Sequence, residues 1–400
     1  MEASKPHTDN FDTNTPISVI LAQDYSSRLP SAKLHRFSIA PMMDITNVHF
    51  RLLVRLLTRH STLWTEMIHA NSLLLDGRDA DAVLRFNPIE HPVVLQLGGS
   101  DAQALARAAQ ISELSGYDEV NVNCGCPSER VQSGCFGAVL MKDPQKVAMC
   151  VKKMAEKIKI PVHVKCRIGV DDDDSYEFVR NFVEVVYKEG GCSHFIIHSR
   201  KCLLNGLSPL QNRTVPPLKY EVVKQLKKDF PDLQFSINGG IKTYEEIEGF
   251  LDPEHGLTGV MVGRLAYENP WILSDIDRRI YGLPNPGFSR KEVLKIWGKY
   301  CDRELEINDK IAWPSLTKPI MSLFYNERNS AIYRRVISDQ KLIKTCKRFS
   351  DLIDIAIEEF EKLNPEAMNQ KPPAMESESP NDCFKDQLQK VLDPALKKDQ

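Results

Sequence analysis

Eight short apolar runs recur along the first part of the chain, roughly 25 to 40 residues apart, from about residue 36. They occupy 37–41, 63–67, 92–97, 119–123, 162–168, 194–198, 233–238 and 259–263. Amphipathic stretches of helical length separate most of them, at 101–114, 144–157, 176–188 and 220–229. Because strands that alternate with helices pair in parallel through right-handed crossovers, the pattern predicts an α/β fold. Eight such units predict a (β/α)8 TIM barrel over residues 36–282.

An open, doubly wound sheet is the alternative architecture for strands that alternate with helices. Its dinucleotide-binding form has a Gly-x-Gly-x-x-Gly motif after the first strand. No such motif follows residues 37–41. The barrel is therefore the favoured prediction.

The pattern changes at residues 282–287, where Gly-Leu-Pro-Asn-Pro-Gly interrupts the alternation of apolar runs and amphipathic stretches. A region rich in Lys and Arg follows, with helical periodicity over 290–305, 316–326 and 330–363. We expect it to form a smaller all-helical domain over residues 288–363.

Both ends of the chain are predicted to lie outside these two domains. Pro, Ser, Glu and Asn dominate from residue 364, a composition that predicts a disordered tail over 364–400, with a short helix at 388–396 at most. Residues 1–35 are predicted to form a mobile N-terminal extension.

Charge and cysteine content narrow the function classes. The 400 residues carry a net charge of −2, so any RNA contact must come from local patches. Ten cysteines at irregular spacings, without a secretory signal or a membrane-length apolar run, predict a reducing compartment. We expect the cytoplasm, with an organelle left open. Cys124, Cys126 and Cys135 have no second Cys/His pair at a zinc-type spacing, so no metal is expected.

Residues 121–128, Asn-Val-Asn-Cys-Gly-Cys-Pro-Ser, predict a strand that stops abruptly in a reactive loop. The carboxyl ends of barrel strands are where catalytic residues lie. Cys126, beyond the glycine, is the candidate reactive thiol. Cys124 is expected to be buried, as free cysteines commonly are.

A Pro-Met-Met segment, polar residues and glycines lie at the ends of the predicted strands. These strand-end residues are Pro41, Met42, Met43, Glu66, Gln96, Asn123, Lys165, His198, Asn238, Gly239, Gly240, Gly263 and Arg264. Glycines after the last two strands predict a phosphate site, where backbone N–H groups approach an anion closely. Two tight turns that need glycine for geometry alone are the alternative.

Lys165 alternates with His163 and Arg167, so all three side chains are predicted to share one face. An inward lysine would stabilise negative charge on a reduced flavin, or form a Schiff base. A structural ion pair with Glu66 or a neighbour is equally compatible. His198 is either a hydrogen-bonded structural residue or a donor to the cofactor.

The loop after residue 198 contains Arg200, Lys201 and Arg213, and these cations could follow a nucleic-acid backbone. An ordinary charged surface is the alternative.

Longer motifs show a resemblance to a known family. Ala-Pro-Met-Met-Asp at 40–44, the segment 121–132, Lys-Cys-Arg-Ile-Gly at 165–169 and Ile-Ile-His-Ser-Arg-Lys at 196–201 resemble the tRNA-dihydrouridine synthases. The last run, with Gly-Leu-Ser-Pro at 206–209, is similar to the A-type branch. The resemblance runs in unbroken order over 36–282 and more weakly to about 345.

This resemblance implies an enzyme that reduces the C5–C6 bond of a uridine in the tRNA D-loop, of the 20/20a type, using FMN and NADPH. Cys126 matches the catalytic cysteine and Asn123 a residue that faces the uridine. The matching FMN positions are Pro41, Met42, Met43, Gln96, Lys165, His198, Asn238, Gly239, Gly240, Gly263 and Arg264. Candidate tRNA contacts are Arg200, Lys201, Arg213 and Arg334.

Three positions depart from the family pattern: Asn47, Cys124 and Leu210. Leu210 stands where a basic residue is common, which bears on the tRNA contacts.

The implied chemistry places hydride at C6 from the flavin and a proton at C5 from Cys126. Two other functions stay open: a dihydroorotate-dehydrogenase-like flavin barrel that acts on a free pyrimidine, and a tRNA-binding factor without catalysis. Oligomeric state is not predicted.

Overall fold

The computed structural model describes residues 34–75, 83–375 and 382–392. Its centre is a parallel eight-stranded sheet in the order β1-β8-β7-β6-β5-β4-β3-β2. A parallel bridge between Ser38 and Thr62 brings β1 beside β2, which closes the barrel. The strands are β1 (Phe37–Ile39), β2 (Leu63–His69), β3 (Val93–Gly98), β4 (Glu119–Cys124), β5 (Val162–Arg167), β6 (His194–His198), β7 (Gln234–Asn238) and β8 (Gly259–Val262). The predicted TIM barrel is confirmed.

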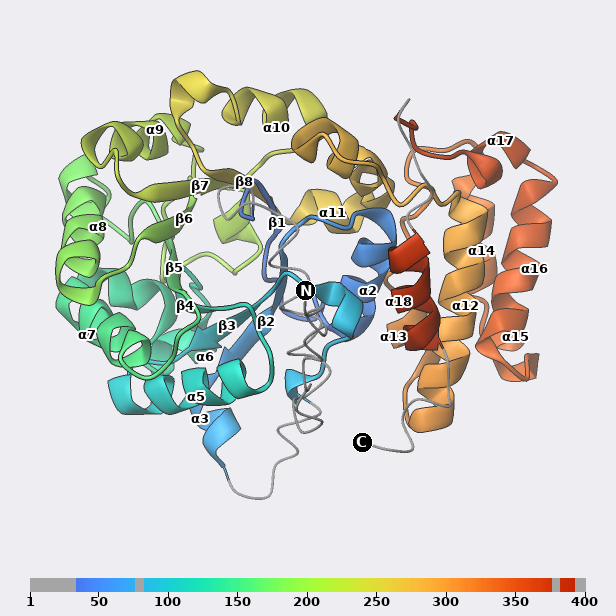
Figure 1. Cartoon of the computed structure of the whole chain (residues 1–400), viewed down its shortest axis with the longest axis horizontal. Helices are drawn as coiled ribbons and strands as arrows, with labels where there is room; N and C mark the ends of the chain where they lie inside the picture. The colour runs from blue at the N-terminus through green and yellow to red at the C-terminus, as the bar shows by residue number, and fades with distance from the viewer. Residues whose placement is uncertain (1–33, 76–82, 376–381, 393–400) are drawn as a thin grey trace, which may run out of the picture.

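Helices surround this barrel (Figure 1). They are α2 (Val48–Leu57), α3 (Ala70–Leu74), α5 (Ala102–Leu114), α7 (Pro144–Ala155), α8 (Tyr176–Gly190), α9 (Tyr220–Asp229), α10 (Tyr244–Phe250) and α11 (Arg264–Glu268). The helices bury apolar residues: α8, for example, buries Val179, Phe182, Val183 and Val186. Polar caps fix where helices begin, as at Asp101, whose carboxylate accepts from the Ala104 amide at 2.7 Å.

Strand alternation divides the barrel interior into layers. On the inner face of β6, His194 lies at one end, Ile196 in the middle and His198 at the carboxyl end. Ile196 belongs to a separate apolar cluster with Ala40, Trp64, Val94 and Met261, all at most 6% exposed. We call Trp64, Val94, Ile196 and Met261 the apolar layer.

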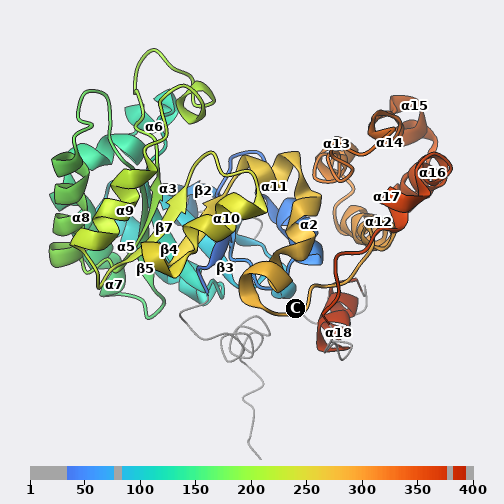
Figure 2. The ribbon, with the colours of Figure 1, turned by 90° about the horizontal axis from the view of Figure 1, so that it is seen from above.

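A helical region follows the barrel and lies beside it in both views (Figures 1 and 2). It contains α12 (Arg290–Ile307), α13 (Trp313–Thr317), α14 (Ser330–Ile337), α15 (Gln340–Thr345) and α16 (Phe349–Glu361). The structure differs from the prediction at two helices. Residues 318–326 form turns, and 330–363 divides into three helices because the Asp339 side chain caps a new one.

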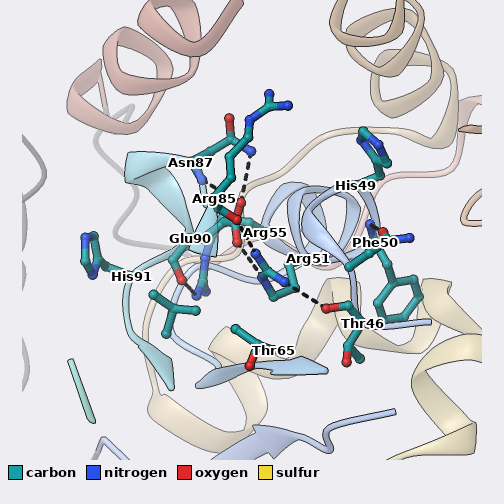
Figure 3. A network of polar contacts seen from close by, with 12 residues as sticks. Thr46, His49, Phe50, Arg51, Arg55, Thr65, Arg85, Asn87, Glu90 and His91 are labelled. Atoms are coloured by element: carbon teal, nitrogen blue, oxygen red, sulfur yellow. Dashed lines mark hydrogen bonds and ion pairs between the residues drawn. The ribbon is translucent and has the colours of Figure 1, made fainter. Parts of the chain in front are cut away.

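A buried polar network joins α2 to the segment before β3 (Figure 3). Arg51 Nε donates to Glu90 Oε2 at 2.6 Å, with side chains only 5% and 0% exposed. Arg51 also donates to the Thr46 carbonyl at 2.8 Å, in the loop after β1. Beside this network, Arg85 pairs with Glu304 of α12, so the barrel and the helical region share one polar interface.

The end of the chain differs from the predicted tail. Helices α17 (Pro365–Asn369) and α18 (Asp382–Leu392) are present there, and α18 contacts both α12 and η2 (Pro88–Glu90). Phe384, Leu388 and Val391 are each 5% exposed, since their spacing puts them on one helical face. Residues 1–33 of the predicted extension lie outside the described residues.

Within the described ranges, no helix is both long enough and apolar enough to cross a membrane.

Candidate active site

A cavity of about 1030 Å³ opens at the carboxyl ends of the strands. Fourteen of the predicted site residues line it: Pro41, Met42, Met43, Gln96, Asn123, Cys126, Lys165, His198, Arg213, Asn238, Gly239, Gly240, Gly263 and Arg264. Residues from seven strand ends that are far apart in the sequence thus meet in one place, and Met67, Ile68 and His69 of β2 complete the lining.

The Cys126 loop is held by the side chain of Asn123. Asn123 Oδ1 accepts from the Gly125 amide at 3.1 Å and the Cys126 amide at 2.9 Å. This local turn reverses the chain directly after β4. The Cys126 thiol is partly exposed to the cavity and lies 3.6 Å from Ser128 Oγ. The Cys126 carbonyl accepts from the Ala138 amide at 2.9 Å, which anchors the other side of the loop.

A ladder of amides fixes Asn123 in turn. Asn123 Nδ2 donates to Gln96 Oε1 at 2.8 Å, and Gln96 Nε2 donates to Asn121 Oδ1 at 2.9 Å. Gln96 is 1% exposed, so solvent does not compete for these hydrogen bonds. The orientation of the Cys126 loop is therefore set from within the barrel wall.

The two cysteines of the octapeptide differ in environment. Cys124 is fully buried, and burial raises the pKa of its thiol well above the usual range. It pairs in register with Cys166 and does not line the cavity. Only Cys126 can therefore contact a ligand in the cavity.

Lys165 and His198 provide one cation and one neutral ring. Lys165 Nζ donates to Asn238 Oδ1 at 3.2 Å, and burial lowers the pKa of this lysine to about 8. Burial, followed by the charges of Arg167 and Lys165, lowers the pKa of His198 well below its ordinary value. His198 is thus a neutral hydrogen-bonding ring at neutral pH.

The turn after β7 requires glycine. Gly239 has a φ of +117°, and a Cβ there would lie 2.5 Å from His198 Cδ2. Gly240 has a φ of +74°, and its Cβ would meet Leu218 Cδ1 at 2.5 Å. Both positions let the backbone approach a ligand closely.

The second predicted phosphate turn is less constrained. A Cβ at Gly263 would find its nearest atom at 3.5 Å, in ordinary contact. Arg264 follows it and donates to the Arg213 carbonyl at 3.4 Å.

The predicted basic loop does not face the cavity as a unit. Arg200 is 9% exposed and donates to the Pro216 carbonyl, farther along the same loop. Arg200 therefore has a structural role. Lys201 binds the Asp171 carbonyl at 3.0 Å and Asp174 at 2.9 Å. Arg334 is exposed on α14, away from the cavity lining. Among these four, Arg213 alone lines the cavity.

Arg167 is the site residue that the sequence reasoning missed. It was expected to share a face with Lys165 but was not among the predicted site residues, and it is 3% exposed and lines the cavity. Its guanidinium donates to the carbonyls of Gly125 at 2.8 Å, Lys201 at 3.1 Å and Asn212 at 3.0 Å. It thereby ties the Cys126 loop to the loop after β6. Its alternation with Lys165 was the available signal.

Comparison with known proteins gives the family. Residues 38–359 match the family model "Dihydrouridine synthase (Dus)". The chain belongs to the dihydrouridine synthase family. As a dihydrouridine synthase family member it is an oxidoreductase, and the match includes both the barrel and most of the helical region.

Several relatives are similar over most of their length. The chain is 48% identical over 315 residues to the tRNA-dihydrouridine(20/20a) synthase of Synechocystis sp., covering 79% of this chain and 92% of that protein. It is 47% identical over 304 residues to the protein of the same name from Escherichia coli strain K12, covering 76% and 86%. A solved 2-naphthoyl-CoA reductase complex is 10% identical, with a TM-score of 0.49, covering 64% of this chain and 51% of that one.

Proposed function

We propose that this protein reduces a uridine of the tRNA D-loop to dihydrouridine, at a position of the 20/20a type, with FMN as cofactor and NADPH as reductant. The observation that carries the proposal is the placement of Cys126 and Asn123 in one cavity with Lys165, His198 and the glycine turn after β7. The high identity to the tRNA-dihydrouridine(20/20a) synthases supports the substrate and its position.

The cavity residues fit FMN. The volume of about 1030 Å³ is at the upper end of that typical for cofactor sites, about 300–1,000 Å³. The glycine turn after β7 would hold the phosphate through backbone N–H groups, with Arg264 as a charged partner. Lys165 and Gln96 would contact the ring system. Bound FMN would supply the hydride that reaches C6 of the base.

Cys126 would donate the proton to C5 of the uracil ring. Asn123 would position the base, because its amide lies beside Cys126 and is itself fixed by Gln96. Arg167 would keep the thiol in place through the Gly125 carbonyl. A proton donor must be held within hydrogen-bond reach of its target, which these contacts favour.

We assign residues 36–282 as the catalytic domain and 288–363 as the tRNA-binding domain. The base must leave its stack to enter the cavity, at a cost of a few kcal/mol, roughly, which contacts to the tRNA offset. Arg213 at the cavity and Arg334, exposed on α14, are the proposed phosphate contacts. The proposed location is the cytoplasm.

The test compares two cysteine variants. Cys126→Ala should keep flavin absorbance and NADPH oxidation but lose most tRNA turnover, measured as dihydrouridine formed in tRNA from a strain that lacks this modification. Cys124→Ala, at a buried position outside the cavity, is the matched control and should retain turnover. Equal loss in both variants would overturn the role of Cys126.

Two further results would point to the other functions. Turnover of free uracil or orotate without tRNA would favour the free-pyrimidine oxidoreductase. Colourless protein that binds tRNA would favour the non-catalytic factor.

A further inference from the structure

A buried group of three histidines and one glutamate lies at the amino-terminal ends of the strands, opposite the cavity. His35 precedes β1, Glu119 begins β4, His163 is the second residue of β5, and His194 begins β6. Their exposed fractions lie between 0% and 6%. We call these four residues the histidine cluster.

One ring nitrogen of each histidine lies within hydrogen-bond distance of a side-chain oxygen. His35 Nε2 lies 2.8 Å from Glu119 Oε1, and His163 Nδ1 lies 3.1 Å from Glu119 Oε2. His194 Nε2 lies 2.8 Å from Ser236 Oγ. A ring that donates through one nitrogen presents a lone pair on the other.

The second ring nitrogens of two of these histidines have no partner. His35 Nδ1 and His194 Nδ1 are buried and have no hydrogen-bond partner. Such buried atoms are rare, because an unsatisfied polar group costs free energy. One ligand atom from each histidine lies within 4.8 Å of those from the other two. The ring centroids are 4.3 to 5.3 Å apart.

The backbone around His35 is shaped to place it there. Gly259, the first residue of β8, faces the His35 carbonyl so closely that a Cβ would lie 1.7 Å from its oxygen. The same Cβ would lie 3.0 Å from Ser236 Oγ. Only glycine therefore lets the segment before β1 reach under the barrel.

The histidine cluster is separate from the proposed FMN site. On the inner face of β6, Ile196 lies between His194 and His198, and it belongs to the apolar layer. None of the four cluster residues lines the cavity. A ligand of the histidine cluster would therefore act on the barrel's stability rather than on the reduction.

We propose that His35, His163 and His194 bind one divalent transition-metal ion, with Zn²⁺ as the probe. Imidazole nitrogens suit this class of ion. Glu119 and Ser236 would orient the rings, in the arrangement in which a ligating histidine donates its second N–H to an oxygen. Zinc–nitrogen bonds of about 2.0–2.1 Å require the 4.8 Å span to contract, and leave a fourth position for water.

Sequence spacing could not indicate this site. The three histidines are far apart along the chain and match no short metal motif, and the expectation of no metal rested on short Cys/His spacings. The site exists only because the barrel brings the starts of β1, β5 and β6 together.

Metal content and ligation test the proposal on untagged, full-length protein produced in zinc-supplemented medium. We expect about one Zn²⁺ per chain by mass spectrometry, with X-ray absorption showing nitrogen ligands at about 2.0–2.1 Å. Dialysis against a chelator should lower the Tm by about 2 °C or more. Zinc well below one per chain, or sulfur ligands at about 2.3 Å, would overturn the proposal.

Two variants locate the ion. His194→Ala should lose the zinc, whereas His255→Ala, outside the histidine cluster, should keep it. Circular dichroism verifies that each variant is folded. A folded His194→Ala protein with full zinc content would also overturn the proposal. If His194→Ala does not fold, the ligand type measured on the unmodified protein decides.

Discussion

FMN affinity is expected to fall as the pH rises from 7 to 9, because Lys165 loses its charge over this range. Burial lowers the pKa of Lys165 to about 8, and only the protonated amine donates three hydrogen bonds while carrying charge. The FMN phosphate does not confound the effect, since a phosphomonoester has its second pKa near about 6 and stays dianionic. Burial also keeps His198 neutral throughout, with its pKa well below the ordinary value.

The magnitude follows from that pKa. A group with a pKa of about 8 is about nine-tenths protonated at pH 7 and about one-tenth protonated at pH 9. The Kd should therefore rise by up to about tenfold, equivalent to about 1.4 kcal/mol. Stability of the FMN-free protein should change in the opposite direction. Between pH 8 and the unperturbed 10.5 the unfolded chain binds more protons, so unfolding becomes less favourable as the pH rises.

Quenching of FMN fluorescence at constant ionic strength, at pH 7, 8 and 9, measures the Kd. Lys165→Met should bind FMN more weakly at pH 7 and show almost no pH dependence, because it removes the titrating amine without removing its apolar stem. An equal slope in this variant, or tighter binding by the unmodified protein at pH 9, would refute the reasoning.

Two further substitutions test the glycine turn and the network of Figure 3. Gly239→Ala should lower FMN affinity by about tenfold or more, since an alanine is strained at a φ of +117° and collides with His198, whereas Gly249→Ala, with nothing within 4 Å, should bind normally in the same titration. Glu90→Gln should cost about 3 kcal/mol in urea unfolding, because it leaves the buried Arg51 charge without its partner. Glu156→Gln, which removes the exposed ion pair with Lys153, should leave the unfolding midpoint unchanged. Similar shifts in the Glu90→Gln and Glu156→Gln proteins would contradict a special role for the buried Arg51–Glu90 pair.

Strand positions could be predicted because a barrel strand is apolar on its outer face and has polar residues at its carboxyl end. The predicted run 194–198 has the bounds of β6, and 119–123 falls one residue short of β4. The same rule found Gln96, Asn123 and Lys165, each at a strand end and each lining the cavity.

Loop conformation could not be predicted in this way. Arg200 lies near a strand end, as Arg167 does, but the sequence gives no sign that its guanidinium is bound to the Pro216 carbonyl and does not line the cavity. The helix predicted over 316–326 failed for a similar reason, because turns at 318–326 and the positive φ of Asn326 override an apolar period that fits a helix. In the tail, polar composition concealed the apolar face of α18.

The apolar layer divides the interior of the barrel into two parts. Trp64, Val94, Ile196 and Met261 lie between the open cavity at the carboxyl ends of the strands and the buried histidine cluster at their amino ends. Substitutions that change substrate choice can therefore accumulate on the cavity side of the apolar layer without compensating changes on the side of the histidine cluster. The buried residues at the amino ends of the strands are correspondingly positions where an engineer can strengthen or weaken the scaffold while leaving the reaction as it is.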